Sequence, residues 1–179
     1  MTTVRASTTS TQTRDDWDSI ATWRGGAAGE YRTEAFAVPF RFTTTSAWTG
    51  SESIDSVSIR KTGESGIWLL DMGFGSLEEA VGHFQELENA EFAEPSPTSI
   101  GDATAVSMEG TSTGNQSIAN LADGLSLFWS AGTETTLYLV DVEGDIVVIV
   151  VDRSQPIPLD FVEEAQSILD SIVWRALDG

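Results

Sequence analysis

Ile146-Val147-Val148-Ile149-Val150-Val151 is the stretch that decides the fold, because six consecutive apolar residues leave no polar side for water. A second apolar run, residues 137–142, precedes it, and Glu143-Gly144 between the two runs is an Xaa-Gly pair of the kind that joins hairpin strands. A strand that is apolar on both sides needs a cover on each face. We therefore expect a hairpin in the middle of a sheet whose two faces are both buried.

Two segments have the helical spacing that such covers require. Residues 76–90 begin with a capping box, in which Ser76 stands three residues before Glu79, and their apolar side chains form a single stripe. A second helix is expected from about Leu159 to Val173. Its acidic residues are expected to face water: Asp160, Glu163, Glu164 and Asp170. The sequence thus predicts an α+β fold, a mainly antiparallel β-sheet with a helix on each face (an α/β/α sandwich).

Shorter apolar runs predict further strands. Residues 36–42 alternate with period two and contain Pro39, which favours an edge position. The other expected strands are residues 57–61, 67–72, 103–108 and 125–129. Between the last two, residues 110–115 predict a polar, mobile loop and residues 118–121 a weakly helical turn.

The N-terminal part of the chain differs in composition from the rest. Residues 1–14 are rich in Thr and Ser and predict a flexible tail. Trp17, Ile20 and Ala21 then fall at roughly helical spacing, and Gly25-Gly26 ends the run. We expect residues 15–179 to form a single domain that begins with this short helix.

The charge balance narrows the classes of partner. Nine basic and 28 acidic residues leave a formal charge of −19. So acidic a chain is repelled by phosphate backbones and anionic lipids, which argues against nucleic acid as a partner and against a membrane surface. There is no long apolar run to insert into a membrane. The absence of cysteine excludes disulfides, zinc–thiolate sites and thiol catalysis.

No residue pattern predicts catalysis, a cofactor or a metal site. His83 is the single histidine, and it lies at the margin of the apolar stripe without a serine in a nucleophile-elbow context. Asp141, Glu143 and Asp145 are spaced like the start of a calcium loop, but Asp152 stands where such a loop needs a helical Glu, so we favour turn solvation. The adjacent acidic pairs are explained by charge at helix ends.

Three residues are candidates for contact with a partner. Trp48 follows the first predicted strand and, if exposed, would be an anchor of the kind enriched at interface hot spots, although packing in the core is the preferred interpretation. Thr113 and Asn115 lie in the glycine-flanked polar loop, where a recognition role is the alternative to a plain connection.

The order of three strands, a helix, four strands and a C-terminal helix resembles the PsbP-like fold. That fold is shared by a photosystem II extrinsic subunit, a Ran-binding nuclear import factor and actinobacterial cell-envelope lipoproteins, and the likeness is closest to the lipoproteins and related exported domains. It rests on residues 76–80 (SLEEA), 100–105 (IGDATA), 136–144 (TLYLVDVEG) and 168–174 (ILDSIVW). These are packing and turn features, so the resemblance implies a non-enzymatic binding or adaptor role at the cell envelope and no catalytic residue.

We therefore expect an extracellular or cell-envelope binding module that presents loops to a protein partner. One alternative is a carrier that holds a small apolar ligand between sheet and helix, and another is a carboxylate-dependent hydrolase. The first residues carry no apolar leader, so the alternative location is the cytoplasm of a high-salt organism, to which the acidity is suited.

Overall fold

The predicted hairpin is the centre of the structure. The computed structural model describes residues 18–19, 27–61, 65–120, 126–153, 157 and 159–175. Strands β12 (Glu134–Val142) and β13 (Asp145–Arg153) pair antiparallel across the turn at Glu143-Gly144, whose φ angles of 57° and 100° both lie in the left-handed region. Every residue from Ile146 to Val151 is buried. The expectation of a hairpin with two buried faces is confirmed.

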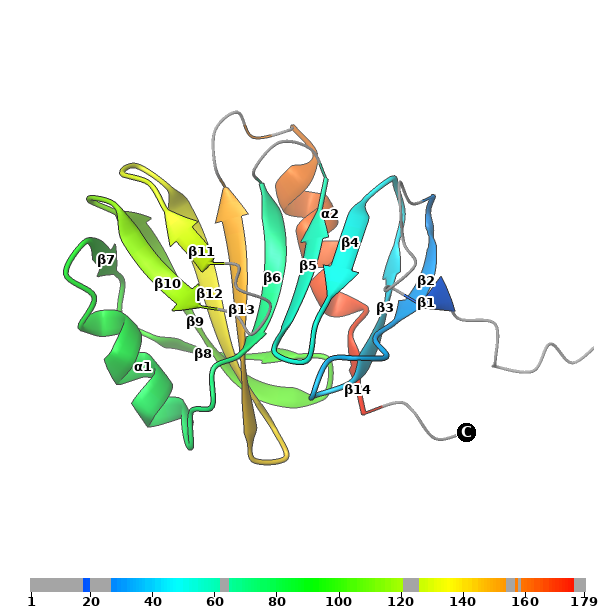
Figure 1. Ribbon diagram of the computed structural model, residues 1–179, viewed down its shortest axis with the longest axis horizontal. Helices are drawn as coiled ribbons and strands as arrows, with labels where there is room; N and C mark the ends of the chain where they lie inside the picture. Colours follow the sequence, from blue (N-terminus) through cyan, green and yellow to red (C-terminus); the bar gives the residue numbers. More distant parts are fainter. Residues whose placement is uncertain are drawn as a thin grey trace, which may run out of the picture.

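Eight strands form the main sheet, which is antiparallel throughout the described residues (Figure 1). The hairpin of β12 and β13 lies in the middle of this sheet, with further strands beside each of its two strands. In spatial order the strands are β4 (Thr49–Glu52), β5 (Ser56–Arg60), β6 (Gly66–Asp71), β13, β12, β9 (Ala103–Ser112) and β7 (Ala90–Phe92). The eighth, β8 (Ser96–Ile100), pairs with the first half of β9, and β7 pairs with the second half. Thus β7 and β8 share one end of the sheet, and β4 lies at the other.

Alternate side chains of β13 enter two separate cores. Val147, Ile149 and Val151 belong to one core with residues of helix α2 (Phe161–Asp170). That core also takes residues from a second sheet of β1 (Asp18–Ser19), β2 (Gly29–Arg32), β3 (Phe40–Thr44) and β14 (Val173–Trp174). Val148 and Val150 belong to the other core, with helix α1 (Leu77–Gln85) and the hairpin of β10 (Gln116–Asn120) and β11 (Ser126–Trp129). Strands outside the main sheet therefore contribute to both cores.

Helix α1 begins where the capping box predicts. Ser76 Oγ accepts a hydrogen bond from the Glu79 amide at 3.1 Å, and Glu79 Oε2 accepts one from the Gly75 amide at 2.8 Å. The helix ends at Gln85 rather than at residue 90, because the chain from Ala90 pairs with β9 as β7. None of the helices formed by the described residues is long and apolar enough to cross a membrane.

Two local predictions upstream of β4 are wrong. The strand expected from Phe36 starts only at Phe40, because residues 34–36 instead direct their amides at the Glu52 carboxylate, with N···O distances of 2.9–3.4 Å. Pro39 therefore precedes the strand and does not lie on a sheet edge. Asp18 and Ser19 pair in parallel with β2, which contradicts the N-terminal helix at these two residues. The rest of that expected helix, and the tail over residues 1–14, lie outside the described residues.

The segment between β9 and β11 also differs from expectation. The weakly helical turn predicted at residues 118–121 is strand β10 as far as Asn120. Ile118 and Ala119 are both buried because the strand bulges between Ser117 and Ala119, which breaks the two-residue alternation. The polar loop predicted from Gly110 is shorter, because β9 continues through Ser112.

Candidate functional site

Four polar side chains form a row across four strands at one end of the sheet. Arg153 of β13 lies opposite Glu134 of β12, Glu134 opposite Thr111 of β9, and Thr111 opposite Glu91 of β7. Residues directly opposite each other in a sheet project from the same face. Because Arg153 follows Val151 by two residues, this is the face on which α2 packs.

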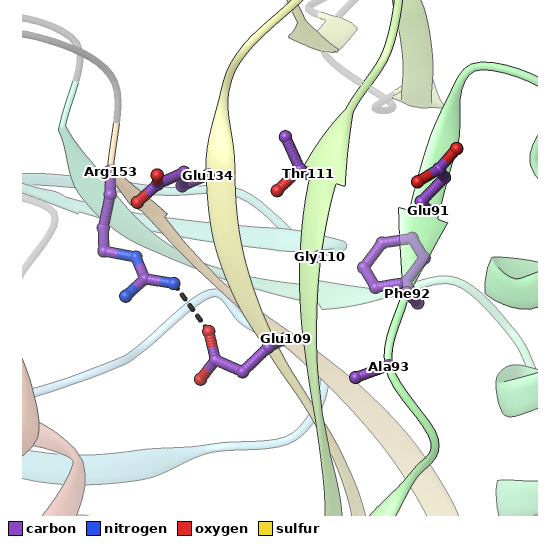
Figure 2. A pocket seen from close by; sticks show the side chains of 8 residues that line it. All are labelled: Glu91, Phe92, Ala93, Glu109, Gly110, Thr111, Glu134 and Arg153. Atoms are coloured by element: carbon purple, nitrogen blue, oxygen red, sulfur yellow. Dashed lines mark hydrogen bonds and ion pairs between the residues drawn. The ribbon is translucent and has the colours of Figure 1, made fainter.

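The row lines an open depression of about 370 Å³, which we call the acidic trough (Figure 2). Figure 2 shows Arg153 and Glu91 at opposite sides, with Glu134 and Thr111 between them. Glu109 joins the row from β9. The complete lining is Glu91, Phe92, Ala93, Glu109, Gly110, Thr111, Glu134 and Arg153. Three carboxylates and one guanidinium leave the trough with two negative charges in excess.

Arg153 is held by one of the three carboxylates. Its Nη2 lies 2.6 Å from Glu109 Oε2, and Thr136 Oγ1 donates to the other oxygen of Glu109 at 3.0 Å. The Arg153 Nε is buried and has no hydrogen-bond partner among the described residues. Both carboxylate oxygens of Glu109 thus have a partner within the protein. Glu91 and Glu134 are exposed, and neither side chain has a hydrogen bond or ion pair with another described residue.

Tyr138 lies two residues beyond Thr136 on the same face of β12 and is half-buried. Burial, followed by the nearby Glu109 carboxylate, raises the pKa of its phenol above the ordinary value. The phenol therefore stays neutral at physiological pH.

The predicted contact residues do not form one site. Trp48 is only 1% exposed, so the exposed-anchor alternative is wrong and the packing interpretation holds. Its ring lies 5.7 Å from that of Phe161 on α2, and its Nε1 donates to Glu164 Oε2 at 3.0 Å. Trp48 directly precedes β4, at the opposite end of the sheet from β7.

Thr113 and Asn115 are exposed in the turn between β9 and β10. The Thr113 amide donates to the Asn89 carbonyl at 2.9 Å, and Asn89 Nδ2 donates to the Asn115 carbonyl at 3.4 Å. A Cβ at Gly114 would lie 2.9 Å from Asn89 Oδ1, so glycine allows this close approach. The turn is therefore attached to the residue that immediately precedes β7, and its recognition role stays a prediction.

An ion cluster that the sequence did not predict lies near Trp48. The chain's single lysine, Lys61, places its Nζ 2.6 Å from Asp160 Oδ2 and 2.8 Å from Glu164 Oε2. The expectation that Glu164 faces water is wrong, because its carboxylate also accepts from Ser46 and Trp48. Burial lowers the pKa of Lys61, but the two carboxylates outweigh burial and raise it. Lys61 therefore stays protonated and is not a catalytic base; the cluster joins α2 to the strands.

The three acidic residues that are spaced like the start of a calcium loop have structural partners. Asp141 Oδ1 accepts from the Gly144 amide at 2.7 Å, and Glu143 and Asp145 both pair with Arg175. Within the described residues, no group of three or more His, Cys, Asp or Glu side chains is arranged to hold a metal ion. His83 is exposed on α1, with its ring 5.2 Å from that of Phe74.

The sequence analysis did not predict the trough, although the sequence contains a signal for it. Glu109 and Thr111, and Glu134 and Thr136, carry the two-residue alternation of their strands beyond the apolar positions. Such continuation marks one face of a sheet becoming polar, but only the register between strands shows that the two polar ends adjoin.

Comparison with known protein families finds no match to this chain, and comparison with curated proteins finds none either.

Proposed function

We propose that the protein is a non-enzymatic binding module whose acidic trough takes a positively charged segment of a partner protein. The observation that carries this proposal is the row of exposed Glu91, Thr111 and Glu134 beside Glu109, with Arg153 as its single cation. A surface with two excess negative charges on a chain of −19 attracts basic groups and repels phosphates and anionic lipids.

The two alternatives to a protein-binding module have less support. A carrier of an apolar ligand needs a predominantly apolar pocket, whereas charged side chains line the trough. Another depression, of about 330 Å³, is also lined by charged groups, among them Asp102, Asp141 and Arg175. A carboxylate-dependent hydrolase needs two carboxyl groups that converge on one bond. In the trough Glu109 is engaged by Arg153 and Thr136, and Glu91 and Glu134 lie two strands apart with Thr111 between them.

The proposal includes the cell-envelope or extracellular location and the PsbP-like relationship. It also includes the finer architecture, in which one helix covers each face of the sheet. That architecture is supported by Ala80 and Phe84 of α1, which belong to one core, and by Phe161 and Ala165 of α2, which belong to the other.

The test is a binding measurement with a short basic peptide and two variants of equal charge. The probe is the blocked pentapeptide Thr-Val-Lys-Val-Thr, labelled for fluorescence polarisation and titrated with the native protein at low salt. The trough variant carries E91Q, E109Q and E134Q. The control variant carries E78Q, E86Q and E163Q at exposed positions on or beside the two helices.

Both triple variants lose the same formal charge, so they differ only in where the charge is lost. We expect the trough variant to bind the peptide about tenfold more weakly than the control variant. Equal affinity of the two variants would mean that the peptide responds to net charge alone, and the proposal would fail.

A further inference from the structure

Strand β7, which borders the trough, pairs with β9 on one side, and no described strand pairs with its other side. Hydrogen bonds from the Ala93 amide to the Glu109 carbonyl (2.8 Å) and from the Thr113 amide to the Asn89 carbonyl (2.9 Å) lie at the two ends of β7. In an antiparallel pair such bonded positions alternate, so the Asn89 carbonyl and the backbone groups of Glu91 and Ala93 point toward β9. Ala90 and Phe92 therefore direct their N–H and C=O groups away from the sheet.

These outward groups are free to pair with another strand. Neither Ala90 nor Phe92 makes a backbone hydrogen bond with any described residue outside its own strand pair. Two residues with outward N–H and C=O groups offer four hydrogen bonds to an added strand. Figure 1 places β7 at the end of the main sheet, which agrees with the strand order.

The neighbouring edge strand is different. The residues of β9 that face this edge are the odd-numbered ones, so Ser96 and Thr98 of β8 face β9 and Pro97 and Ser99 face outward. Proline has no N–H, and an outward proline is a common protection of a sheet edge. Of the two strands at this end of the sheet, only β7 has an N–H group on each of its two outward residues.

The geometry of β7 also specifies the charge of the occupant. If Ala90 and Phe92 bond to an added antiparallel strand, the residue between their partners lies opposite Glu91 as a non-hydrogen-bonded pair, with Cα atoms about 4.5 Å apart. Its side chain projects from the same face as Glu91, toward the trough. Strand spacings of about 4.8 Å put Arg153 roughly 19 Å from that side chain, beyond the Debye length of about 8 Å at physiological salt.

We propose that the partner binds by strand addition to β7, with an extended segment that places a lysine or arginine opposite Glu91. This inference rests on the proposed function and specifies how the partner's basic segment is held. Backbone hydrogen bonds give the pairing, and Glu91 selects the charge at the central position.

The experiment compares three forms of the same pentapeptide with the native protein. The first is Thr-Val-Lys-Val-Thr; the second carries N-methyl groups on both valines, whose amides would otherwise pair with the edge. The third has glutamate in place of lysine. We expect the N-methylated and glutamate peptides each to bind at least about tenfold more weakly than the first. E91Q should reduce the preference for lysine over glutamate at the central position, whereas E78Q, which removes the same charge elsewhere, should leave that preference unchanged.

Hydrogen exchange gives an independent readout that needs no variant. On addition of the lysine peptide, we expect slower exchange at the outward amides of Ala90 and Phe92, with Ser99 on β8 unchanged. If the N-methylated peptide binds as tightly as the first and the Ala90 and Phe92 amides stay unprotected, strand addition is wrong. The proposed function would then still stand provided that the trough variant binds more weakly than its charge-matched control, so the two failures are distinguishable.

Discussion

Arg153 and Glu109 pair diagonally across β12, with Nη2 2.6 Å from Oε2, so the single cation of the trough neutralises one of its three carboxylates. Glu109 is 62% exposed, and an ion pair so open to solvent contributes at most about 1 kcal/mol to stability. Its larger effect is on the electrostatic potential of the trough.

Removal of that cation should strengthen peptide binding. We expect R153Q to bind the lysine pentapeptide several-fold more tightly than the native protein at low salt, with the difference reduced in high salt by screening. R60Q removes the same charge from exposed Arg60 at the other half of the sheet and is the matched control. An equal gain in the two variants would show that the trough charge has no local role.

Gly110 should be essential for the position of β7. A Cβ at this position would lie 2.3 Å from the Phe92 ring, so G110A must displace Phe92 or part of β7. We expect a loss of about 1–3 kcal/mol in the free energy of unfolding, measured with urea, and weaker peptide binding. G82A is the control, because nothing lies within 4 Å of a Cβ there and alanine in a helix is favoured over glycine by about 1 kcal/mol. A stable G110A with native affinity would contradict the packing described for β7.

Trp48 should contribute to stability and not to partner binding. We expect W48A to lose about 3–5 kcal/mol of unfolding free energy, because a large buried ring is removed from its contact with Phe161. W48F keeps most of the ring contact and loses the hydrogen bond to Glu164, so its loss should be smaller. The peptide affinity of the folded W48F protein should equal that of the native protein. A weaker affinity would show that Trp48 does contribute to partner binding.

The ion cluster predicts a pH dependence of stability with a definite sign. Burial raises the pKa of Glu164, but hydrogen bonds from Lys61, Ser46 and Trp48 outweigh it and lower the pKa. Because the pKa of Glu164 is lower in the folded state than in the unfolded state, its interactions stabilise the fold at pH values above the unfolded pKa of about 4.3. This stabilisation is lost as pH falls through the folded pKa. The raised pKa of Lys61 gives stability that is present below about 10.4 and is lost as pH rises through its folded value.

We therefore expect K61M to be less stable than the native protein between these limits. Urea unfolding at a series of pH values should show the difference largest near neutrality and smaller at both extremes. A difference that stays constant from pH 3 to pH 8, as a packing effect would, contradicts the role assigned to the ion pairs.

The parts of the fold that follow from local pattern were predictable. Six apolar residues from Ile146 on require burial on both sides wherever they lie, and Ser76 with Glu79 satisfies free amides of a helix start within four residues. Strand β10 was not predictable in this way, because the bulge after Ser117 places two adjacent residues in the core and imitates a helical turn. Polar strand β4 has no apolar alternation at all.

The acidic trough depends on a different kind of information. Glu91, Glu109, Glu134 and Arg153 come from four strands, and each is unremarkable within its own segment. Their proximity follows from the register between strands, which local pattern does not define. The position of Glu164 illustrates the same limit, since its helix pattern predicts exposure and only the tertiary packing brings Lys61 and Trp48 to it.

The most direct test of the central claim is an NMR titration of the native protein with the lysine pentapeptide. If the acidic trough is the binding site, the largest backbone amide shift changes will fall on residues 90–93 and 109–111, with smaller changes at residues 134 and 153 and much smaller ones on α1. Changes of similar size at acidic residues over the whole surface, or a maximum on α1 or α2, would contradict the assignment of the trough as the binding site.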